Sequence, residues 1–262
     1  MKQHILFFDI DGTIVDEATG VVPESTKKAI LQARENGHIL MLNTGRCRVI
    51  WPQEILDLGF HGAIGGCGTY IEYQGEEIFH TVLSVNLCLE IVKDLKKWHI
   101  DGVLEAKEKS YFRKDIFFPT VKRIFEDADM YGGHSLADWE EPGMQFDKMA
   151  LWYDAESDMQ AFKRKYEKQF DFIKRDETFY EVVPRGYSKA SGMKYMIEKL
   201  NIPWENTIAV GDSANDIPMF EYAALSIGMK SERHGVLEYT DYITDSVMND
   251  GIYKAFCHYR LI

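Results

Sequence analysis

The sequence predicts an α/β protein in which a doubly wound, mostly parallel sheet carries an inserted second domain. Three short apolar runs, at residues 4–8, 38–42 and 206–210, lack helical spacing, and each leads into polar residues. Such runs are typical of strands that are buried on both faces of a parallel sheet. Between the second and the third run, roughly 100 residues of strand–helix–strand character interrupt the α/β frame, which indicates an insertion.

The first apolar run predicts a chemically active sheet edge. Asp9 follows its last apolar residue, Asp11 comes two residues later, and Gly12 permits a tight turn. Open α/β sheets bind their ligands at the carboxyl ends of the strands. Two carboxylates about 4 Å apart repel each other by roughly 4 kcal/mol at an effective dielectric constant near 20, unless a cation lies between them. The alternative is an ordinary solvated Asp-x-Asp-Gly turn.

The first part of the main domain then alternates helices and strands. Glu24 or Ser25 is a suitable N-cap for a helix that ends near Asn36, and Gly37 is its stop signal. The strand at 38–42 runs into the polar segment 43–46, which offers a hydroxyl and N–H groups to a phosphate but is also a plain turn sequence. We expect a helix over 47–58, a strand at 61–65, and a hairpin of 69–73 and 76–80 around Gln-Gly.

From about residue 82 the spacing of apolar residues in the sequence changes. Helical spacing of apolar residues predicts helices over 84–98, near 120–128, and from Met159 to Phe170. Strands are expected at 102–106, 110–113, 148–153, 171–174 and 179–183, and a glycine-rich, acidic loop over 131–143. We therefore assign residues 82–186 to an inserted α/β domain and residues 1–81 and 187–262 to the main domain.

The main domain resumes at Ser188 and Lys189. A helix with an apolar stripe leads to the strand at 206–210, which runs into Gly-Asp-Ser-Ala-Asn-Asp at 211–216. Strands at 225–228 and 242–244 and a helix over 250–258 complete the domain. Because this is the third apolar strand that ends in polar residues, we expect the three polar segments to meet at one edge of the sheet.

Composition argues against several classes of function. The formal net charge of -12 disfavours a nucleic-acid partner, because phosphate backbones require a basic surface, but it permits a small phosphorylated substrate. The four cysteines are far apart and form no C-x-x-C pair, which favours free thiols over a zinc site or disulfides. No apolar run approaches the roughly 20 residues of a membrane-spanning helix, and no signal peptide is evident. We expect a soluble, cytoplasmic protein without a membrane partner.

Four motifs stand in a fixed order along the chain: Asp9-x-Asp11-Gly-Thr, Thr44-Gly-Arg, Lys189, and Gly211-Asp212-x3-Asp216. This set resembles the motifs of the haloacid dehalogenase (HAD) superfamily. The long insertion between the second and third motifs resembles the Cof-type branch, which has an α/β cap (type IIB). The resemblance extends over essentially the whole chain. It implies a HAD-like core, a cap that sets substrate specificity, and Mg²⁺-dependent phosphatase activity.

The resemblance also implies a role for each motif residue. Asp9 would be the nucleophile that forms an aspartyl-phosphate, and Asp11 would act as general acid and then as general base. Mg²⁺ would be bound by the Asp9 carboxylate, the Asp11 main-chain carbonyl and the Asp212 carboxylate, with Asp216 in support. The residues expected at the phosphoryl group or the substrate are Thr44, Gly45, Arg46, Lys189 and Asn215. Considered alone, Lys189 fits an ordinary solvated residue at a helix start better than a catalytic residue.

One position departs from the branch. Cys67-Gly-Thr stands where Asn-Gly-Ala is usual, and Cys67 is either a small buried residue or a thiol that lines the cleft. The basic and aromatic residues considered for substrate specificity are Lys107, Lys109, Phe112, Arg113, Arg175 and Arg185, together with Arg46.

The implied substrates are small phosphomonoesters, often sugar phosphates or related metabolites. Three alternatives remain open: a phosphomutase of the same superfamily, a metal-independent dehalogenase, and a phosphoacceptor or ligand sensor without turnover. Asp11 and the pair Asp212 and Asp216 disfavour the dehalogenase, and Asp11 disfavours the phosphoacceptor or sensor. The sequence leaves the natural substrate and the oligomeric state undetermined.

Overall fold

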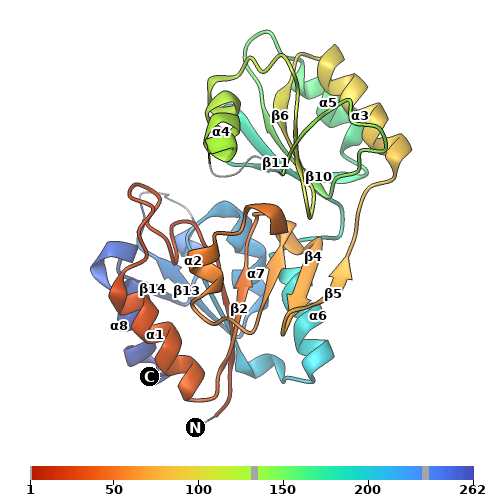
Figure 1. Cartoon of the computed structure of the whole chain (residues 1–262). Helices are drawn as coiled ribbons and strands as arrows, with labels where there is room; N and C mark the ends of the chain where they lie inside the picture. Colours follow the sequence, from red (N-terminus) through yellow and green to blue (C-terminus); the bar gives the residue numbers. More distant parts are fainter. Residues whose placement is uncertain (1, 131–134, 232–235) are drawn as a thin grey trace. The chain divides into compact units, whose positions relative to one another are not determined.

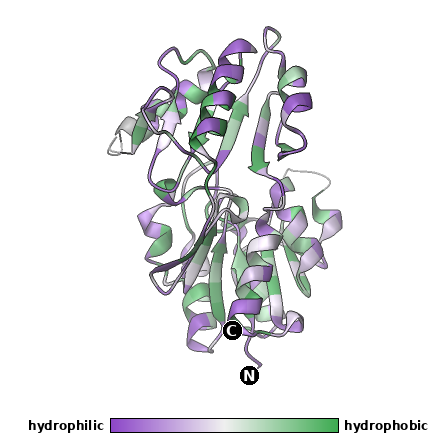
Figure 2. Cartoon of the chain, turned by 90° about the vertical axis from the view of Figure 1, so that its right-hand side faces the viewer, coloured by the Kyte–Doolittle hydropathy of each residue, from purple (hydrophilic) through white to green (hydrophobic). Residues whose placement is uncertain are grey.

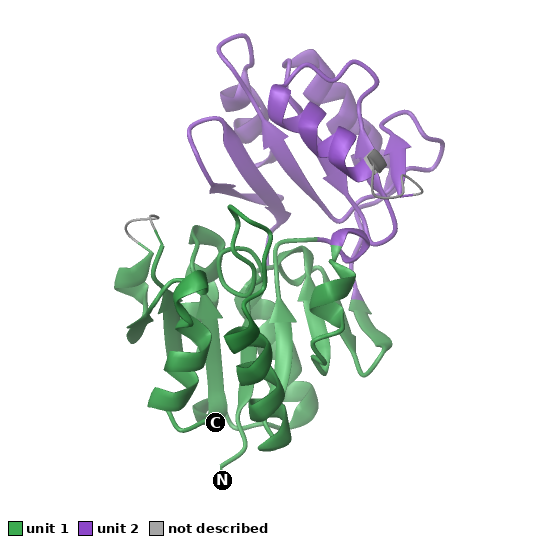
Figure 3. Ribbon diagram, turned by 60° about the vertical axis from the view of Figure 1, so that its left-hand side comes forward, with its two compact units in different colours: residues 1–46, 51–79, 187–262 green, residues 47–50, 80–186 purple. Residues whose placement is uncertain are grey.

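The computed structural model describes residues 2–130, 135–231 and 236–262. The chain divides into two compact units (Figure 3). Unit 1 comprises residues 1–46, 51–79 and 187–262, and unit 2 comprises residues 47–50 and 80–186. Each unit has its own sheet and its own hydrophobic core.

Unit 1 is built on a mostly parallel sheet (Figure 1). Its strands are β1 (Ile5–Phe8), β2 (Ile39–Asn43), β3 (Gly62–Gly65), β4 (Tyr70–Tyr73), β5 (Glu76–His80), β12 (Thr207–Gly211), β13 (Leu225–Met229) and β14 (Tyr242–Thr244). Their order in the sheet is β14-β13-β12-β1-β2-β3-β4-β5. The pairs from β14 to β3 are parallel, and β4 is antiparallel to β3.

Helices cover both faces of this sheet, as in a doubly wound fold. They are α1 (Glu24–Glu35), α2 (Gln53–Leu56), α6 (Lys189–Leu200), α7 (Ile217–Tyr222) and α8 (Gly251–His258). Leu6 and Phe8 of β1 pack in one core cluster with α1 and α8, whereas Ile5 and Phe7 pack in another with α6 and α7. This alternation explains why β1 is apolar at every position. Figure 2 shows hydrophobic residues concentrated on the strands and hydrophilic residues on the helices around them.

Unit 2 has a mixed sheet with helices on both faces. Its strands are β6 (Asp101–Glu105), β7 (Ser110–Phe112), β8 (Leu136–Asp138), β9 (Lys148–Trp152), β10 (Phe170–Lys174) and β11 (Phe179–Pro184), in the order β10-β11-β9-β6-β7-β8. Its helices are α3 (Val85–Lys97), α4 (Pro119–Met130) and α5 (Met159–Tyr166). One face packs against α3 and α5, and Val121 of α4 packs against the other.

Three predicted elements differ from the structure. The helix expected from Met159 to Phe170 ends at Tyr166, and Phe170 is the first residue of β10. The helix expected over 47–58 is a 3-10 turn at Arg48–Ile50 followed by the short α2, because Pro52 lacks an N–H donor and disfavours helical backbone at Trp51. The loop expected over 131–143 contains β8, which pairs in parallel with β7. Residues 131–134 of that loop lie outside the described residues.

Other local predictions agree with the structure. The Gln-Gly turn of the hairpin has positive φ at both residues, 53° at Gln74 and 82° at Gly75, as a type I′ turn requires.

Within the described ranges, none of the helices is long and apolar enough to cross a membrane.

Candidate active site

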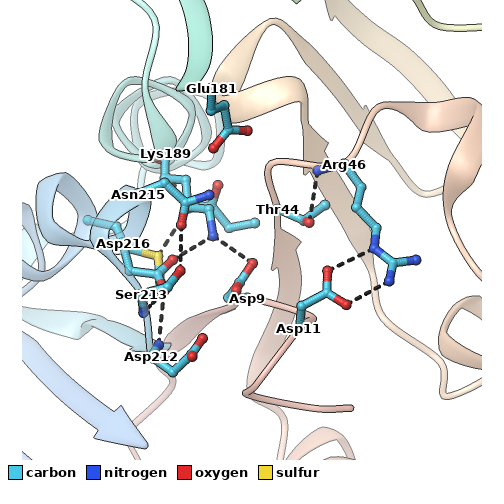
Figure 4. Close-up of polar contacts among 12 residues, drawn as sticks. Asp9, Asp11, Thr44, Arg46, Glu181, Lys189, Asp212, Ser213, Asn215 and Asp216 are labelled. Atoms are coloured by element: carbon cyan, nitrogen blue, oxygen red, sulfur yellow. Dashed lines mark hydrogen bonds and ion pairs between the residues drawn. The ribbon is translucent and has the colours of Figure 1, made fainter. Parts of the chain in front are cut away.

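Neighbouring parallel strands bring the predicted polar segments to one edge of the unit 1 sheet. The strands β12, β1 and β2 lie side by side, and their carboxyl ends lead to Asp212, Asp9 and Thr44 respectively. The Asp9 N–H still donates to the Val210 carbonyl at 3.0 Å, so the sheet ladder itself positions this residue. Figure 4 shows the side chains of these segments facing a common site.

Three buried carboxylates form the centre of this site. Asp9, Asp212 and Asp216 are 4%, 1% and 0% exposed, and each offers an oxygen atom within 4.8 Å of the others. Lys189, which is 1% exposed, donates from Nζ to Asp9 Oδ1 at 2.6 Å and to Asp216 Oδ1 at 2.5 Å. We call these four residues the acid–lysine cluster.

The buried charges in the cluster alter one another's ionisation. Burial raises the pKa of Asp9 to about 7; Lys189 opposes this rise, and Asp216 and Asp11 add to it. Burial alone lowers the pKa of the Lys189 ammonium, but the carboxylates of Asp216 and Asp9 outweigh burial and raise it. Lys189 therefore stays charged, and it is not the solvated residue that its sequence context allowed.

Lys189 owes its position to the start of α6, of which it is the first residue. Ser188 is the N-cap, and its side chain accepts from the Ser191 N–H while the Ser191 hydroxyl accepts from the Ser188 N–H. This reciprocal pair is a capping box. The Asn43 side chain of β2 donates to the Lys189 carbonyl at 3.1 Å, which ties the helix start to the sheet.

Asp216 organises the loop that follows β12. Its Oδ2 accepts from the N–H groups of Asp212 and Ser213, both at 2.9 Å, while its Oδ1 accepts from Lys189. The Ser213 hydroxyl donates to Asn215 Oδ1 at 2.8 Å. Asp216 therefore fixes the loop that carries Asp212, and its predicted support of a metal ion stays a prediction. Sequence reasoning missed Asn43 and Ser213, although both are polar residues at strand ends, which was the available signal.

The donor set fits a hard divalent cation. Asp9, Asp212 and Asp216 supply carboxylate oxygens, which Mg²⁺ and Ca²⁺ prefer. When all three are ionised, they and the Lys189 ammonium sum to a formal charge of −2, which a divalent cation neutralises. Gly12 leaves room for this arrangement, since a Cβ at Gly12 would lie 2.6 Å from Asp212 Cγ.

Arg46 pairs with Asp11 in this structure. Its Nε donates to Asp11 Oδ2 at 2.8 Å and its Nη2 donates to Asp11 Oδ1 at 2.6 Å, a bidentate pair. The buried Thr44 hydroxyl accepts from the Arg46 N–H at 3.1 Å, across Gly45. In this structure Arg46 thus orients the Asp11 carboxylate, and its predicted contact with the substrate stays a prediction.

Cys67 lies beside Lys189 of the acid–lysine cluster. Its backbone has a conformation that few residues adopt. It is buried, its φ is 54°, and its N–H donates to the Thr44 carbonyl at 3.1 Å. Asn tolerates this left-handed conformation better than most residues, which is a backbone reason for the Asn that the branch usually has here. Cys67 is thus buried, and its side chain lies near enough to Lys189 to interact with it, so a thiol that lines the site stays open.

The residues considered for specificity make contacts within unit 2. Lys109 pairs with Glu141, Arg113 with Asp115 at 2.8 Å, and Arg185 with Asp171 at 3.3 Å. The others also have partners there or lie in its core: Lys107 pairs with Glu108, Arg175 with Glu181, and Phe112 packs against Phe125.

Comparison with known proteins identifies the class to which this fold and site belong. The chain matches the haloacid dehalogenase-like hydrolase family over residues 6–256. The match spans nearly the whole chain, and the protein belongs to this family.

Individual relatives agree with the assignment. The chain is 28% identical to YkrA of Bacillus subtilis, with 97% of each chain covered. It is 28% identical to the 5-amino-6-(5-phospho-D-ribitylamino)uracil phosphatase YcsE of the same organism, covering 98% of this chain and 96% of the relative. The solved structure of the HAD subclass IIB sugar phosphatase BT4131 superimposes with a TM-score of 0.85 at 26% identity, covering 99% of this chain and 100% of that one.

These findings confirm three predictions from the sequence. The resemblance to the Cof-type, type IIB branch is confirmed, as is the α/β fold class with its mostly parallel core sheet. The protein is an enzyme of the phosphatase class of this superfamily.

Proposed function

We propose that the protein hydrolyses small phosphomonoesters, using Mg²⁺, through a covalent aspartyl-phosphate on Asp9. The observation that carries this proposal is the acid–lysine cluster, in which buried acids and one buried ammonium converge at the end of β1. A buried set of like charges is costly unless a cation is bound, so its presence favours a catalytic site over a structural one.

In the first step, an Asp9 carboxylate oxygen attacks phosphorus and the bond from phosphorus to the ester oxygen breaks. Asp11 gives its proton to that departing oxygen, so the alcohol leaves neutral. Lys189 and Thr44 hold the phosphoryl oxygens, and the fixed ammonium stabilises the charge that spreads over them. Arg46 donates two hydrogen bonds to the Asp11 carboxylate and so orients it for taking a proton from water in the second step.

In the second step, water attacks the same phosphorus and Asp11 takes the proton of that water. The bond between phosphorus and the Asp9 oxygen breaks, which releases inorganic phosphate and restores both carboxyl groups. Mg²⁺ held by Asp9, Asp212 and the Asp11 carbonyl would neutralise negative charge on the phosphoryl group. Asp216 would keep Asp212 in place through the two N–H groups that it binds.

The named relatives support small phosphorylated metabolites as substrates. One is named a sugar phosphatase, and another is named for a ribityl phosphate ester, so both names describe phosphorylated compounds with several hydroxyl groups. The charge of -12 agrees with a small substrate that needs only a local cationic site.

Phosphate release from a panel of metabolite monoesters with Mg²⁺ tests the proposal. Asp9→Asn should abolish turnover, and Asp11→Asn should lower kcat by about 10²–10⁴-fold, because only the acid–base function is lost. Chromatography of the products separates hydrolysis from a mutase reaction, which would give an isomeric phosphate instead. Wild-type activity of Asp9→Asn on these esters would refute the mechanism.

A further inference from the structure

Trp51 holds the main chain of the segment that carries Thr44 and Arg46. Its indole Nε1–H donates to the Arg46 carbonyl at 3.0 Å, although residues 47–50 separate the two in the sequence. Those intervening residues belong to unit 2, whereas Arg46 and Trp51 belong to unit 1. The chain therefore leaves unit 1 directly after Arg46 and returns to it at Trp51, and this hydrogen bond joins the two points.

The indole ring of Trp51 has a defined seat on the sheet of unit 1. It is buried and packs edge-to-face against Tyr70 of β4, with the ring centroids 5.8 Å apart. It also lies against Gly65 of β3, because a Cβ on Gly65 would be only 2.6 Å from Trp51 Cζ2. Glycine at position 65 therefore allows the ring to come close enough to reach the Arg46 carbonyl.

The residue that accepts from Trp51 is the one that orients Asp11. The Arg46 carbonyl also accepts from the Gly66 N–H at 3.0 Å, so both lone pairs of this oxygen are used. The Arg46 guanidinium donates two hydrogen bonds to the Asp11 carboxylate (Figure 4). A bidentate pair depends on the geometry of both groups, so it requires a fixed main chain at Arg46.

Thr44 depends less on Trp51 than Arg46 does. The Thr44 N–H donates to the Ile64 carbonyl at 2.9 Å, and the Thr44 carbonyl accepts from the Cys67 N–H at 3.1 Å. These bonds tie Thr44 directly to β3 and to the turn that follows it. Loss of the Trp51 hydrogen bond should therefore disturb Arg46 and leave Thr44 in place.

We propose that Trp51 is a positioning residue for the phosphatase reaction. It fixes the main chain of Arg46, and through Arg46 it keeps the Asp11 carboxylate oriented as a base. This inference rests on the proposed function, in which Asp11 takes a proton from water in the second step. It gives Trp51 no contact with the substrate, so the loss of its N–H should lower kcat and leave KM unchanged.

Trp51→Phe tests the inference, because it keeps an aromatic ring and removes the N–H donor. Turnover of para-nitrophenyl phosphate is measured with Mg²⁺; nitrophenolate leaves without a proton, so the rate depends on the second step. The value of kcat should fall about fivefold to tenfold, the effect of one neutral hydrogen bond. In Arg46→Ala, which already lacks the guanidinium, adding Trp51→Phe should change kcat by less than about twofold, since both act on the same contact.

Trp139→Phe is the matched control. The Trp139 indole is also buried, and its Nε1–H donates to a main-chain carbonyl, that of Tyr111, at the same distance of 3.0 Å. It lies in the core of unit 2. Its loss should lower Tm by a similar amount and leave kcat unchanged.

Gly65→Ala is a second variant that reaches the same contact from the strand beneath the ring. The added Cβ should displace the Trp51 indole from its seat. It should reproduce the loss in kcat, and the loss should again disappear in Arg46→Ala. Thermal melting shows whether each variant is folded, and Gly65→Ala decides the question if Trp51→Phe is not.

Equal losses of kcat in the wild-type and Arg46→Ala backgrounds would overturn the inference, because Trp51 would then act without Arg46. Unchanged kcat in Trp51→Phe, or an equal loss in Trp139→Phe, would also overturn it. Each of these results leaves the phosphatase function intact. A wild-type protein that releases phosphate neither from para-nitrophenyl phosphate nor from the metabolite monoesters would instead overturn the proposed function, and the inference with it.

Discussion

Lys189 and Asp216 show how single residues of the site depend on one another. The buried ammonium contacts two buried carboxylates, and Asp216 in turn fixes two N–H groups of the loop that carries Asp212. Removing either partner leaves a buried charge without compensation, which costs several kcal/mol in other proteins. Substitutions of these two residues therefore confound stability with catalysis, and a subtler change is a better probe of the site.

Gly12→Ala is such a change. Gly12 has a φ of 76°, and an added Cβ would lie 2.6 Å from Asp212 Cγ, so the carboxylate must move. We expect the Mg²⁺ concentration for half-maximal activity to rise about tenfold, as for other changes to groups that support metal ligands.

Gly20→Ala is the control for the backbone effect of this change. Gly20 has a similar φ of 70°, but nothing lies within 4 Å of an added Cβ. It should lose a similar roughly 1 kcal/mol of stability from the left-handed backbone without changing the Mg²⁺ requirement. An identical Mg²⁺ requirement in both variants would contradict the role given to Asp212.

The limits of sequence reasoning are also visible at the scale of residues. Strand ends rich in Asp and Thr predicted where the site lies, because strand polarity alone decides which ends of a parallel sheet meet. The pairing of Arg46 with Asp11, and the hydrogen bond from Trp51 to the Arg46 carbonyl, could not be predicted. Such contacts depend on the register between strands and on rotamers, which leave no periodic signal in the sequence.

At the scale of elements, helix α6 connects fold stability to catalysis. Ser188→Ala removes the hydroxyl that accepts from the Ser191 N–H, which should cost about 1 kcal/mol and lower Tm by a few degrees. Because Lys189 is the next residue, fraying of this turn should also displace its ammonium. We expect kcat to fall by about tenfold or more, since small misplacements of catalytic groups are costly.

Ser84→Ala is the matched control for this prediction. Ser84 is the N-cap of α3, and its side chain accepts from the Leu87 N–H. Its loss should lower Tm by a similar amount and leave kcat unchanged. Equal effects of the two variants on kcat would show that α6 does not position Lys189.

Elements with strong periodicity could be predicted from the sequence, and short irregular ones could not. The apolar stripe of α3 and the continuous apolar run of β1 are each signals of buried structure. Pro52 interrupts the helix expected over 47–58, and proline is a clear break signal in a sequence. Strand β8 has only three residues and forms by parallel pairing with β7, so no alternation was available to reveal it.

At the scale of the whole molecule, the stability of the protein should depend on pH through Asp9. Its pKa is 3.8 in the unfolded chain and about 7 in the folded protein without a cation, mainly because of burial. Below pH 4 the carboxyl group is protonated in both states, so it contributes no pH dependence. Between pH 4 and pH 7 the unfolded chain binds fewer protons than the folded protein, so stability falls as the pH rises. Above pH 7 this decrease in the free energy of unfolding is complete, and it is on the order of 4 kcal/mol.

Thermal melts in a chelator, compared between the wild type and Asp9→Asn, measure this contribution. Asparagine does not titrate in this range. The Tm of the wild type should therefore fall relative to the Tm of Asp9→Asn as the pH rises from about 5 to about 8. Adding Mg²⁺ should reverse the trend, because the cation binds the ionised carboxylate and stabilises the folded state in which the acids converge. Asp9→Asn should respond to Mg²⁺ much less. If the difference in Tm were independent of pH, or if Mg²⁺ stabilised both proteins equally, the Asp9 carboxylate would be neither the strained group nor the cation ligand that its burial beside Asp212 and Asp216 indicates.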